Sequence, residues 1–111
     1  MDQQVCEVIV TASDAEWLAR YTRSLVEKRL CACGHNIAPI RSIYRWEGNI
    51  YDEPEARVAL HTRVDLVSEI VADVKQNHSY DLACTIAIPI FGGSSDYIAW
   101  IIAETREPGS Q

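Results

Sequence analysis

The sequence predicts an α+β fold in which helices cover one face of an antiparallel sheet. Two observations predict it. Apolar residues alternate in several runs of strand length and recur at helical spacing in two longer segments. The segments follow the order strand, helix, strand, strand, helix, strand, which is that of a ferredoxin-like split β-α-β sheet, and a short helix is expected after them. With 111 residues, 48% of them hydrophobic, we expect one domain over 1–111 with its own core.

The first strand is predicted over residues 5–12, where β-branched residues dominate the run VCEVIVTA. A helix is predicted next, because Ser13 followed by Glu16 has the spacing of a capping box, which satisfies the free N–H groups of a helix start. Apolar residues then recur at helical spacing to about Leu30, and residues 31–34 are expected to end the helix.

A long antiparallel hairpin is predicted over residues 36–62. Its first strand contains Pro39, which indicates an edge position or a bulge because proline has no N–H for a neighbouring strand. Residues 47–49 (Glu-Gly-Asn) supply the turn, and the second strand follows Pro54. In that second strand one face carries Ala56, Val58, Leu60 and Thr62, and the other carries Arg57, Ala59 and His61.

The second main helix is predicted to use Thr62 and Asp65 at its start and to end near Asn77. A strand that is apolar on both faces follows over residues 82–90. Ser95 is then expected to cap the short C-terminal helix.

Charge narrows the choice of partners. Ten basic and sixteen acidic side chains give a net charge of −6, so an acidic surface repels nucleic acid and anionic membranes, and neither is an expected partner. No apolar run is long enough to span a membrane, and the first residues lack the positive charge of an export signal. We therefore expect a cytoplasmic protein, with a loose tail over residues 106–111.

The stretch SIYRWEG places Tyr44 and Trp46 beside a turn, where a solvated loop would not carry two aromatic residues. Two main helices can cover only one face of the sheet. Apolar surface left bare on the other face indicates self-association, so we expect these aromatic side chains at a subunit interface.

Several separated segments resemble the CutA family, which is named for divalent-cation tolerance: LVEKRLCAC, SIYRWEG, the H-x-Y of NHSYD, and IPIFGGSSDYIAW. The similarity runs in register from about Val8 to Ile102. The resemblance implies a homotrimer of ferredoxin-like subunits, in which the long hairpin passes from one subunit to the next. That trimer is also similar in shape to the PII signalling proteins, which are ligand-sensing adaptors.

The chain also departs from the family pattern. His61 stands where the family usually has lysine, Ser79-Tyr80-Asp81 where it has Pro-Tyr-Glu, and Ala83-Cys84 where it has Pro-Glu. The opposite charges of that lysine and glutamate are therefore absent, with His61 and Cys84 in their places. These replacements either abolish or redirect the family role, and the sequence leaves both alternatives open.

Two thiols and two imidazoles form the candidate metal set: Cys33, His61, His78 and Cys84. Such donors suit zinc or copper, neither of which is expected as an obligatory cofactor. Strand ends can bring the four together within one subunit or across a trimer boundary. Their spacing matches no metal motif, however. The competing interpretation makes Cys84 a core cysteine and His78 a helix-end imidazole that favours the helix dipole.

A second set is predicted to line the subunit interface or a small cleft within it: Tyr44, Trp46, Glu47, Tyr80, Asp81, Tyr97 and Trp100.

The sequence therefore predicts a CutA-like homotrimer that binds divalent or transition-metal ions and is linked to metal tolerance, with Cys33 as the first-choice ligand. Three alternatives stay open: a PII-like adaptor that binds a small metabolite between subunits, an enzyme that uses Cys33 as a thiolate nucleophile, and a stable scaffold. No catalytic group has a supporting sequence context, so a non-enzymatic role is expected.

Overall fold

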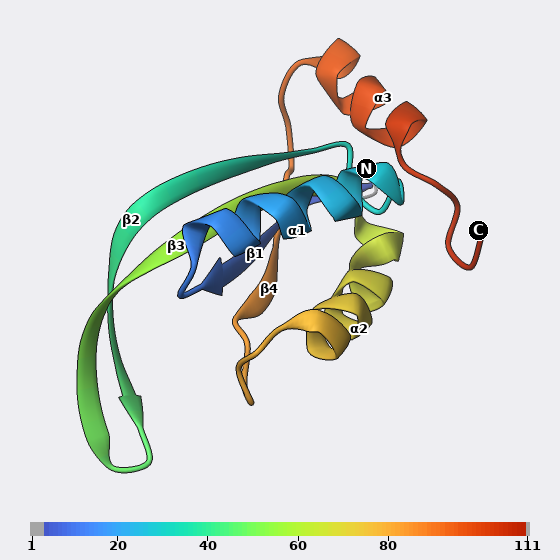
Figure 1. The fold of residues 1–111 in the computed structure, drawn as a ribbon. Helices are drawn as coiled ribbons and strands as arrows, with labels where there is room; N and C mark the ends of the chain where they lie inside the picture. The colour runs from blue at the N-terminus through green and yellow to red at the C-terminus, as the bar shows by residue number, and fades with distance from the viewer. Residues whose placement is uncertain (1–3, 111) are drawn as a thin grey trace.

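A four-stranded antiparallel sheet with the strand order β2-β3-β1-β4 organises the chain, as the computed structural model of residues 4–110 shows (Figure 1). Its elements are β1 (Val5–Ala12), α1 (Ala15–Glu27), β2 (Cys33–Trp46), β3 (Asn49–Arg63), a 3-10 turn (Val64–Leu66), α2 (Val67–Asn77), β4 (Thr85–Pro89) and α3 (Ser95–Glu104). This order confirms the ferredoxin-like prediction. The export-signal and tail expectations that concern residues 1–3 and Gln111 lie outside the described residues.

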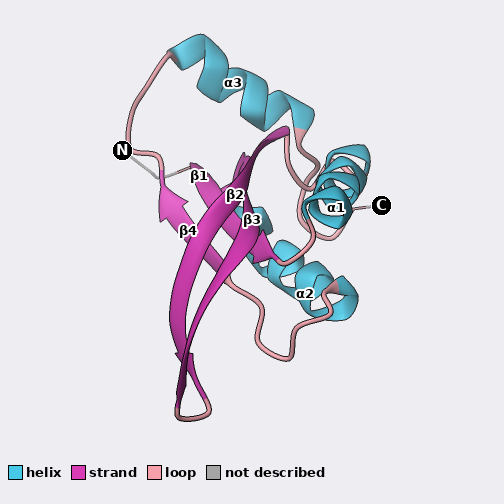
Figure 2. Cartoon of the chain, turned by 60° about the vertical axis from the view of Figure 1, so that its left-hand side comes forward, coloured by secondary structure: helices cyan, strands magenta, loops and turns pink. Residues whose placement is uncertain are grey.

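Helices α1 and α2 lie side by side on one face of the sheet (Figure 2). The core forms between them and alternate residues of the two central strands: Val8 and Val10 of β1, Val58 and Leu60 of β3, Leu18 and Leu25 of α1, and Ile70 and Val74 of α2. Successive strand residues point to opposite faces, so the predicted face of Ala56, Val58, Leu60 and Thr62 is the buried one. None of the helices in the described chain has the length and hydrophobicity that a membrane crossing requires.

The β2–β3 hairpin runs far beyond the end of the sheet and curves away from it (Figure 1). It is longer than predicted, because β2 already begins at Cys33 and β3 begins before Pro54. Pro54 is tolerated inside β3 because β1 pairs with β3 only as far as Ala56, which leaves Pro54 with a neighbour on one side alone. The predicted bulge is confirmed by a register shift between Ile37 and Ile40.

Both predicted serine caps are one residue out of place. Asp14, not Ser13, begins α1, because its carboxylate accepts hydrogen bonds from the backbone N–H groups of Glu16 and Trp17 at 2.9 and 3.1 Å. Ser94, not Ser95, caps α3.

The predicted boundaries of two helices are also wrong. Helix α1 ends at Glu27 rather than near Leu30, since the chain turns at Arg29 with a φ of 61°. Thr62 does not cap the second helix, because it is buried and its hydroxyl donates to the carbonyl of Leu30 at 2.6 Å. Asp65 is instead paired with the guanidinium of Arg63 at 2.9 Å.

The last strand is shorter than the predicted 82–90. β4 has a single neighbour, β1, which pairs with it only from Cys6 to Val10, and beyond Pro89 one further backbone bond follows, from the Ile90 N–H to the Val5 carbonyl at 3.2 Å. Leu82, expected inside the strand, is 72% exposed.

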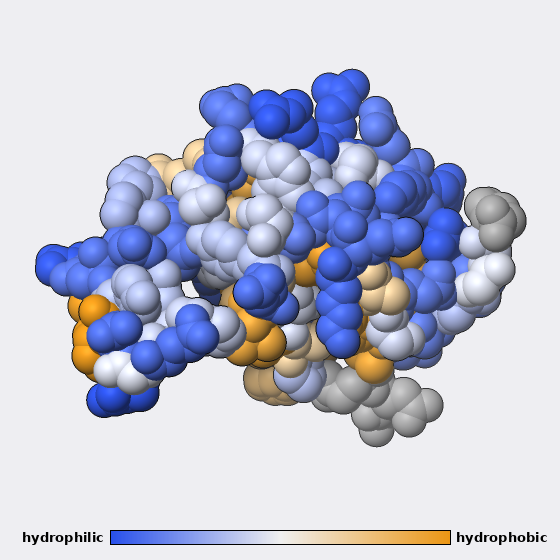
Figure 3. Space-filling model, turned by 60° about the horizontal axis from the view of Figure 1, so that its bottom comes forward, coloured by the Kyte–Doolittle hydropathy of each residue, from blue (hydrophilic) through white to orange (hydrophobic). Residues whose placement is uncertain are grey.

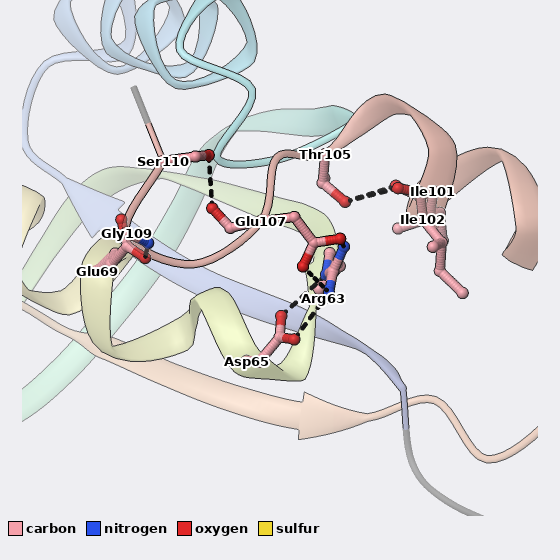
Figure 4. Close-up of polar contacts among 9 residues, drawn as sticks. All are labelled: Arg63, Asp65, Glu69, Ile101, Ile102, Thr105, Glu107, Gly109 and Ser110. Carbon is pink, nitrogen blue, oxygen red and sulfur yellow. Dashed lines mark hydrogen bonds and ion pairs between the residues drawn. The ribbon is translucent and has the colours of Figure 1, made fainter.

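The C-terminal segment is held against the body of the chain (Figure 4). The Arg106 guanidinium contacts the Glu69 carboxylate at 2.8 Å, and the same carboxylate accepts a hydrogen bond from the Gly109 N–H at 2.8 Å. Glu107 reaches Arg63 at 3.2 Å. Arg106 and Glu107, which belong to the predicted loose tail, are thus each paired with a charged residue of the preceding chain.

The sheet face opposite α1 and α2 keeps large apolar side chains exposed to solvent. They include Ile37, Ile86 and Ile88, with Ile43 and Ile50 further along the hairpin. Hydrophobic patches interrupt a mostly hydrophilic surface in Figure 3. The prediction that helices leave one face of the sheet without cover is borne out for the single chain.

Gly34 is required by a close approach between β2 and α1. A Cβ at this position would stand 2.5 Å from Thr22 Cγ2 and 3.1 Å from Leu60 Cδ2. Thr22 cannot easily turn away, because its hydroxyl donates to the Leu18 carbonyl at 2.8 Å and accepts from Asn36 at 3.2 Å.

We therefore predict that Gly34→Ala lowers the free energy of unfolding by about 1–3 kcal/mol, the usual cost of overpacking. Chemical denaturation at one fixed protein concentration measures it. Gly92→Ala is the control, because nothing lies within 4 Å of a Cβ there. Equal denaturation midpoints for the two variants would contradict the packing argument.

Candidate functional site

Three strands bring Glu7, His61 and Cys33 into one row across the sheet. His61 on β3 pairs with Glu7 on β1 and with Cys33 on β2. Directly opposed residues of antiparallel strands point to the same face, so the three side chains lie together on the face away from α1 and α2. Tyr97, in the first turn of α3, reaches the same place.

Hydrogen bonds connect the four side chains: Cys33, Tyr97 and His61 contact one another, and His61 also contacts Glu7. His61 Nε2 lies 2.9 Å from a Glu7 carboxylate oxygen, and His61 Nδ1 lies 2.6 Å from the Tyr97 hydroxyl. The Cys33 Sγ lies 3.3 Å from that hydroxyl and 3.7 Å from His61 Nδ1. We call Cys33 and His61 the Cys33–His61 site.

The direction of each hydrogen bond follows from the chemistry of the partners. An ionised carboxylate only accepts, so His61 Nε2 carries the proton and donates to Glu7. His61 Nδ1 is then left with a lone pair, and the Tyr97 hydroxyl donates to it. Burial, followed by the hydrogen bond with Cys33, raises the pKa of Tyr97 to about 12, so its hydroxyl keeps its proton at neutral pH.

His78 lies far from this site, at the end of α2. Its Nε2 donates to the Thr11 carbonyl at 2.8 Å, and its Nδ1 accepts from the Tyr80 N–H at 3.1 Å. The ring also stands edge-on to Trp17, with centroids 5.2 Å apart. Both ring nitrogens are therefore engaged within the subunit.

Cys84 is exposed in the loop before β4 and is not a core cysteine, so that competing interpretation is wrong. The predicted set of four donors therefore does not meet within one subunit. In the part of the chain that the structure describes, no group of three or more His, Cys, Asp or Glu side chains is placed to hold a metal ion. One pair, Cys33 with His61, does come together.

An open cleft of about 690 Å³ lies along the concave side of the hairpin. Four of the predicted interface residues line it: Tyr44, Trp46, Tyr80 and Asp81, together with Cys84 and others. Of the remaining predicted residues, Glu47 sits at the hairpin turn, and Tyr97 and Trp100 stack on each other on α3 with ring centroids 5.6 Å apart. The predicted aromatic set is thus divided between two places.

The family described as CutA1 divalent ion tolerance protein matches residues 6–104. The chain belongs to the CutA1 family. The match includes all three α-helices and, apart from Val5, all four strands, and it confirms the resemblance predicted from separated sequence segments.

Similar proteins from plants and bacteria have CutA in their names. Protein CutA, chloroplastic, of Arabidopsis thaliana is 35% identical over 99 residues, which are 89% of this chain and 54% of that protein. The divalent-cation tolerance protein CutA of Pectobacterium atrosepticum is 32% identical over 108 residues, 95% of this chain and 98% of that protein. The chain thus spans about half the length of the plant relatives and nearly all of the bacterial one.

Solved structures of CutA1 proteins have the same fold. The crystal structure of CutA1 from Oryza sativa superimposes with a TM-score of 0.90 at 35% identity, covering 94% of this chain and 95% of that one. The protein from Thermus thermophilus gives a TM-score of 0.88 at 28% identity, covering 92% and 99%.

Sequence reasoning missed two residues of the site in this CutA1 chain. Glu7 is the single acid inside the predicted first strand, and that isolated charge was the available signal. His35 lies two residues beyond Cys33 on the same face, and its ring stands edge-on to that of His61 with centroids 5.0 Å apart. Neither could be placed beside His61 without the strand register.

The four cysteines are all free, and they differ in accessibility. Cys6 and Cys31 are buried, and burial raises the pKa of their thiols to about 11 and about 12. Both stay protonated thiols at neutral pH, whereas a thiolate is the nucleophile and the metal ligand.

We therefore predict that a thiol-specific disulfide reagent at neutral pH leaves Cys6 and Cys31 of the native, reduced protein unmodified, and that both react once denaturant is added. Peptide mass mapping identifies the labelled residues. Cys6→Ser and Cys31→Ser variants serve as matched controls for the mapping. Labelling of either buried thiol in the native protein as fast as in denaturant would contradict this burial.

Proposed function

We propose that this CutA1 chain binds a divalent or transition-metal ion, with zinc and copper as the favoured ions, at the Cys33–His61 site, and that this binding underlies a role in metal tolerance. One observation carries the proposal: Cys33 Sγ and His61 Nδ1 lie 3.7 Å apart. A thiolate and an imidazole bound to one tetrahedral ion at ~2.3 and ~2.0 Å are themselves about 3.5 Å apart. The two donors thus need little rearrangement.

Glu7 supports the proposal from the far side of the ring. A metal-binding histidine commonly donates its other N–H to a carboxylate, which orients the ring and makes it a better ligand. Glu7 occupies that position on His61 Nε2 at 2.9 Å, so Nδ1, now bonded to the Tyr97 hydroxyl, is the nitrogen that would bind the ion. The net charge of −6 also favours the approach of cations.

Two donors from one subunit leave further coordination positions for water or for another subunit. We propose a homotrimer, because exposed Ile86 and Ile88 and the half-exposed Trp46 leave apolar surface that a partner copy would cover. Cys84, exposed at the cleft, remains a predicted ligand only across such an interface. A reducing compartment such as the cytoplasm, which we also propose, keeps these thiols available.

A PII-like adaptor is the second candidate, and the cleft favours it. Aromatic side chains of Tyr44, Trp46 and Tyr80 line the cleft together with Arg45. Arg41 also lines it but is paired with Asp52 at 2.7 Å, and the acidic residues Glu55 and Asp81 line it as well. Rings and guanidinium groups together suit a small organic anion with a planar part. Saturable binding of such an anion without a metal ion would favour this candidate.

The metal proposal is tested by calorimetric titration of the reduced protein with zinc and with copper(I). We expect micromolar or tighter binding that Cys33→Ser and His61→Ala each weaken by at least about a hundredfold, since each variant removes a direct ligand. His78→Ala is the matched control and is expected to bind normally. If binding survives the loss of both Cys33 and His61, the ion binds at another site. If the native protein binds neither ion, the proposed metal-binding function is wrong.

The trimer proposal is tested separately through Trp46, which is 38% exposed in the single chain. Trp46→Ala is expected to weaken assembly, because truncation of a buried tryptophan costs about 3–5 kcal/mol. Sedimentation from micromolar to nanomolar concentration measures it. Trp17→Ala on α1, away from the hairpin, is the control. A Trp46→Ala variant that stays trimeric at nanomolar concentration would place this side chain outside the interface.

A further inference from the structure

The Tyr97 hydroxyl forms hydrogen bonds with both atoms of the Cys33–His61 site that would bind the ion. It lies 2.6 Å from His61 Nδ1 and 3.3 Å from Cys33 Sγ, so one phenol bonds both atoms that the proposed ion needs. A neutral imidazole has one lone pair, on the nitrogen that carries no proton. Because Nε2 donates to Glu7, that lone pair is on Nδ1, and the Tyr97 hydroxyl already occupies it.

An ion and Tyr97 therefore compete for the same lone pair. Binding of an ion to Nδ1 requires the O–H of Tyr97 to leave. Binding of the same ion to Cys33 requires the thiol to release its proton to solvent, which removes the hydrogen that the phenol oxygen accepts. Tyr97 therefore gives up its hydrogen bond to Nδ1, and the freed O–H is left beside the Cys33 thiolate, which now accepts rather than donates.

We propose that Tyr97 is the gate of the Cys33–His61 site: its hydroxyl closes the site when no ion is bound, and its release on ion binding alters the stacked Tyr97–Trp100 pair at the surface of α3. This inference rests on the proposed metal function.

The surroundings of Tyr97 allow the release without breaking the core. In the single chain Tyr97 and Trp100 are exposed by 39% and 41%, so the stacked pair lies at the surface of the subunit. Ile101, by contrast, is fully buried against Val5 and Ala32 and anchors the helix. The change in the Tyr97–Trp100 stacking is therefore confined to the outward face of α3, a surface available to a binding partner.

The need to displace the Tyr97 hydroxyl also determines which ions can bind at the Cys33–His61 site. An ion must bind the thiolate and the imidazole strongly enough to displace the Tyr97 hydroxyl from His61 Nδ1 and the proton from the Cys33 thiol. Soft and borderline ions such as copper(I) and zinc do so, whereas magnesium and calcium prefer oxygen donors and gain little from this pair.

The test compares zinc affinity in the reduced native protein and in Tyr97→Phe, which keeps the ring and removes the hydroxyl. We expect Tyr97→Phe to bind zinc about tenfold more tightly, because the free site no longer has a hydrogen bond at Nδ1 to break. Tyr51→Phe, a phenol removed within the hairpin, is the matched control and is expected to leave the affinity unchanged.

A second measurement uses the unaltered chain. Zinc is expected to change the tryptophan fluorescence of the native protein, and Trp100→Phe is expected to abolish that change while zinc still binds. Equal or weaker zinc affinity in Tyr97→Phe would overturn the gate, and weaker affinity would mean that the phenol stabilises the bound ion, as a ligand or as a hydrogen-bond donor to the thiolate. Zinc binding without any change in Trp100 emission would overturn the coupling to α3. Failure of the native protein and all variants to bind would remove the metal function itself.

Discussion

The pairing of β3 between β1 and β2 is the constraint on which the rest of the structure depends. Its register places Glu7, His61 and Cys33 opposite one another on one face. The same register turns Val8, Val58 and Leu60 to the other face, under α1 and α2, as buried apolar residues. A slip of one residue would exchange the two faces, exposing the core and burying the polar row. Core packing therefore fixes the geometry of the candidate site.

The division of the sheet into two unlike faces also explains the exposed apolar surface. Helices α1 and α2 cover one face of the sheet, and α3 covers only the end of the other face, near Val5 and Ala32. The hairpin extends past β1 with no helix against it (Figure 1). A chain of this length cannot cover both faces by itself, and burial of the remaining surface requires another molecule. In the account proposed above, that molecule is a further copy of the chain.

Periodicity and turn chemistry predicted the element order, the sheet type and the buried face, because these depend on residues near one another in sequence. Cap positions were wrong by one residue, since Asp14 and Ser13 are both competent caps and tertiary placement chooses between them. The site was predicted in part: Cys33 and His61 meet, but Glu7 was missed and His78 lies elsewhere. Convergence depends on strand register and on the placement of α3, which no local pattern specifies.

The central claim is that the sheet register makes a thiolate–imidazole pair for an ion. X-ray absorption at the zinc edge of the reduced, zinc-loaded native protein tests this most directly, because it reports the ligand atoms themselves. The account predicts sulfur at about 2.3 Å and imidazole nitrogen at about 2.0 Å in the same coordination shell. A coordination shell of oxygen and nitrogen without sulfur, or one with sulfur but no imidazole, would contradict it.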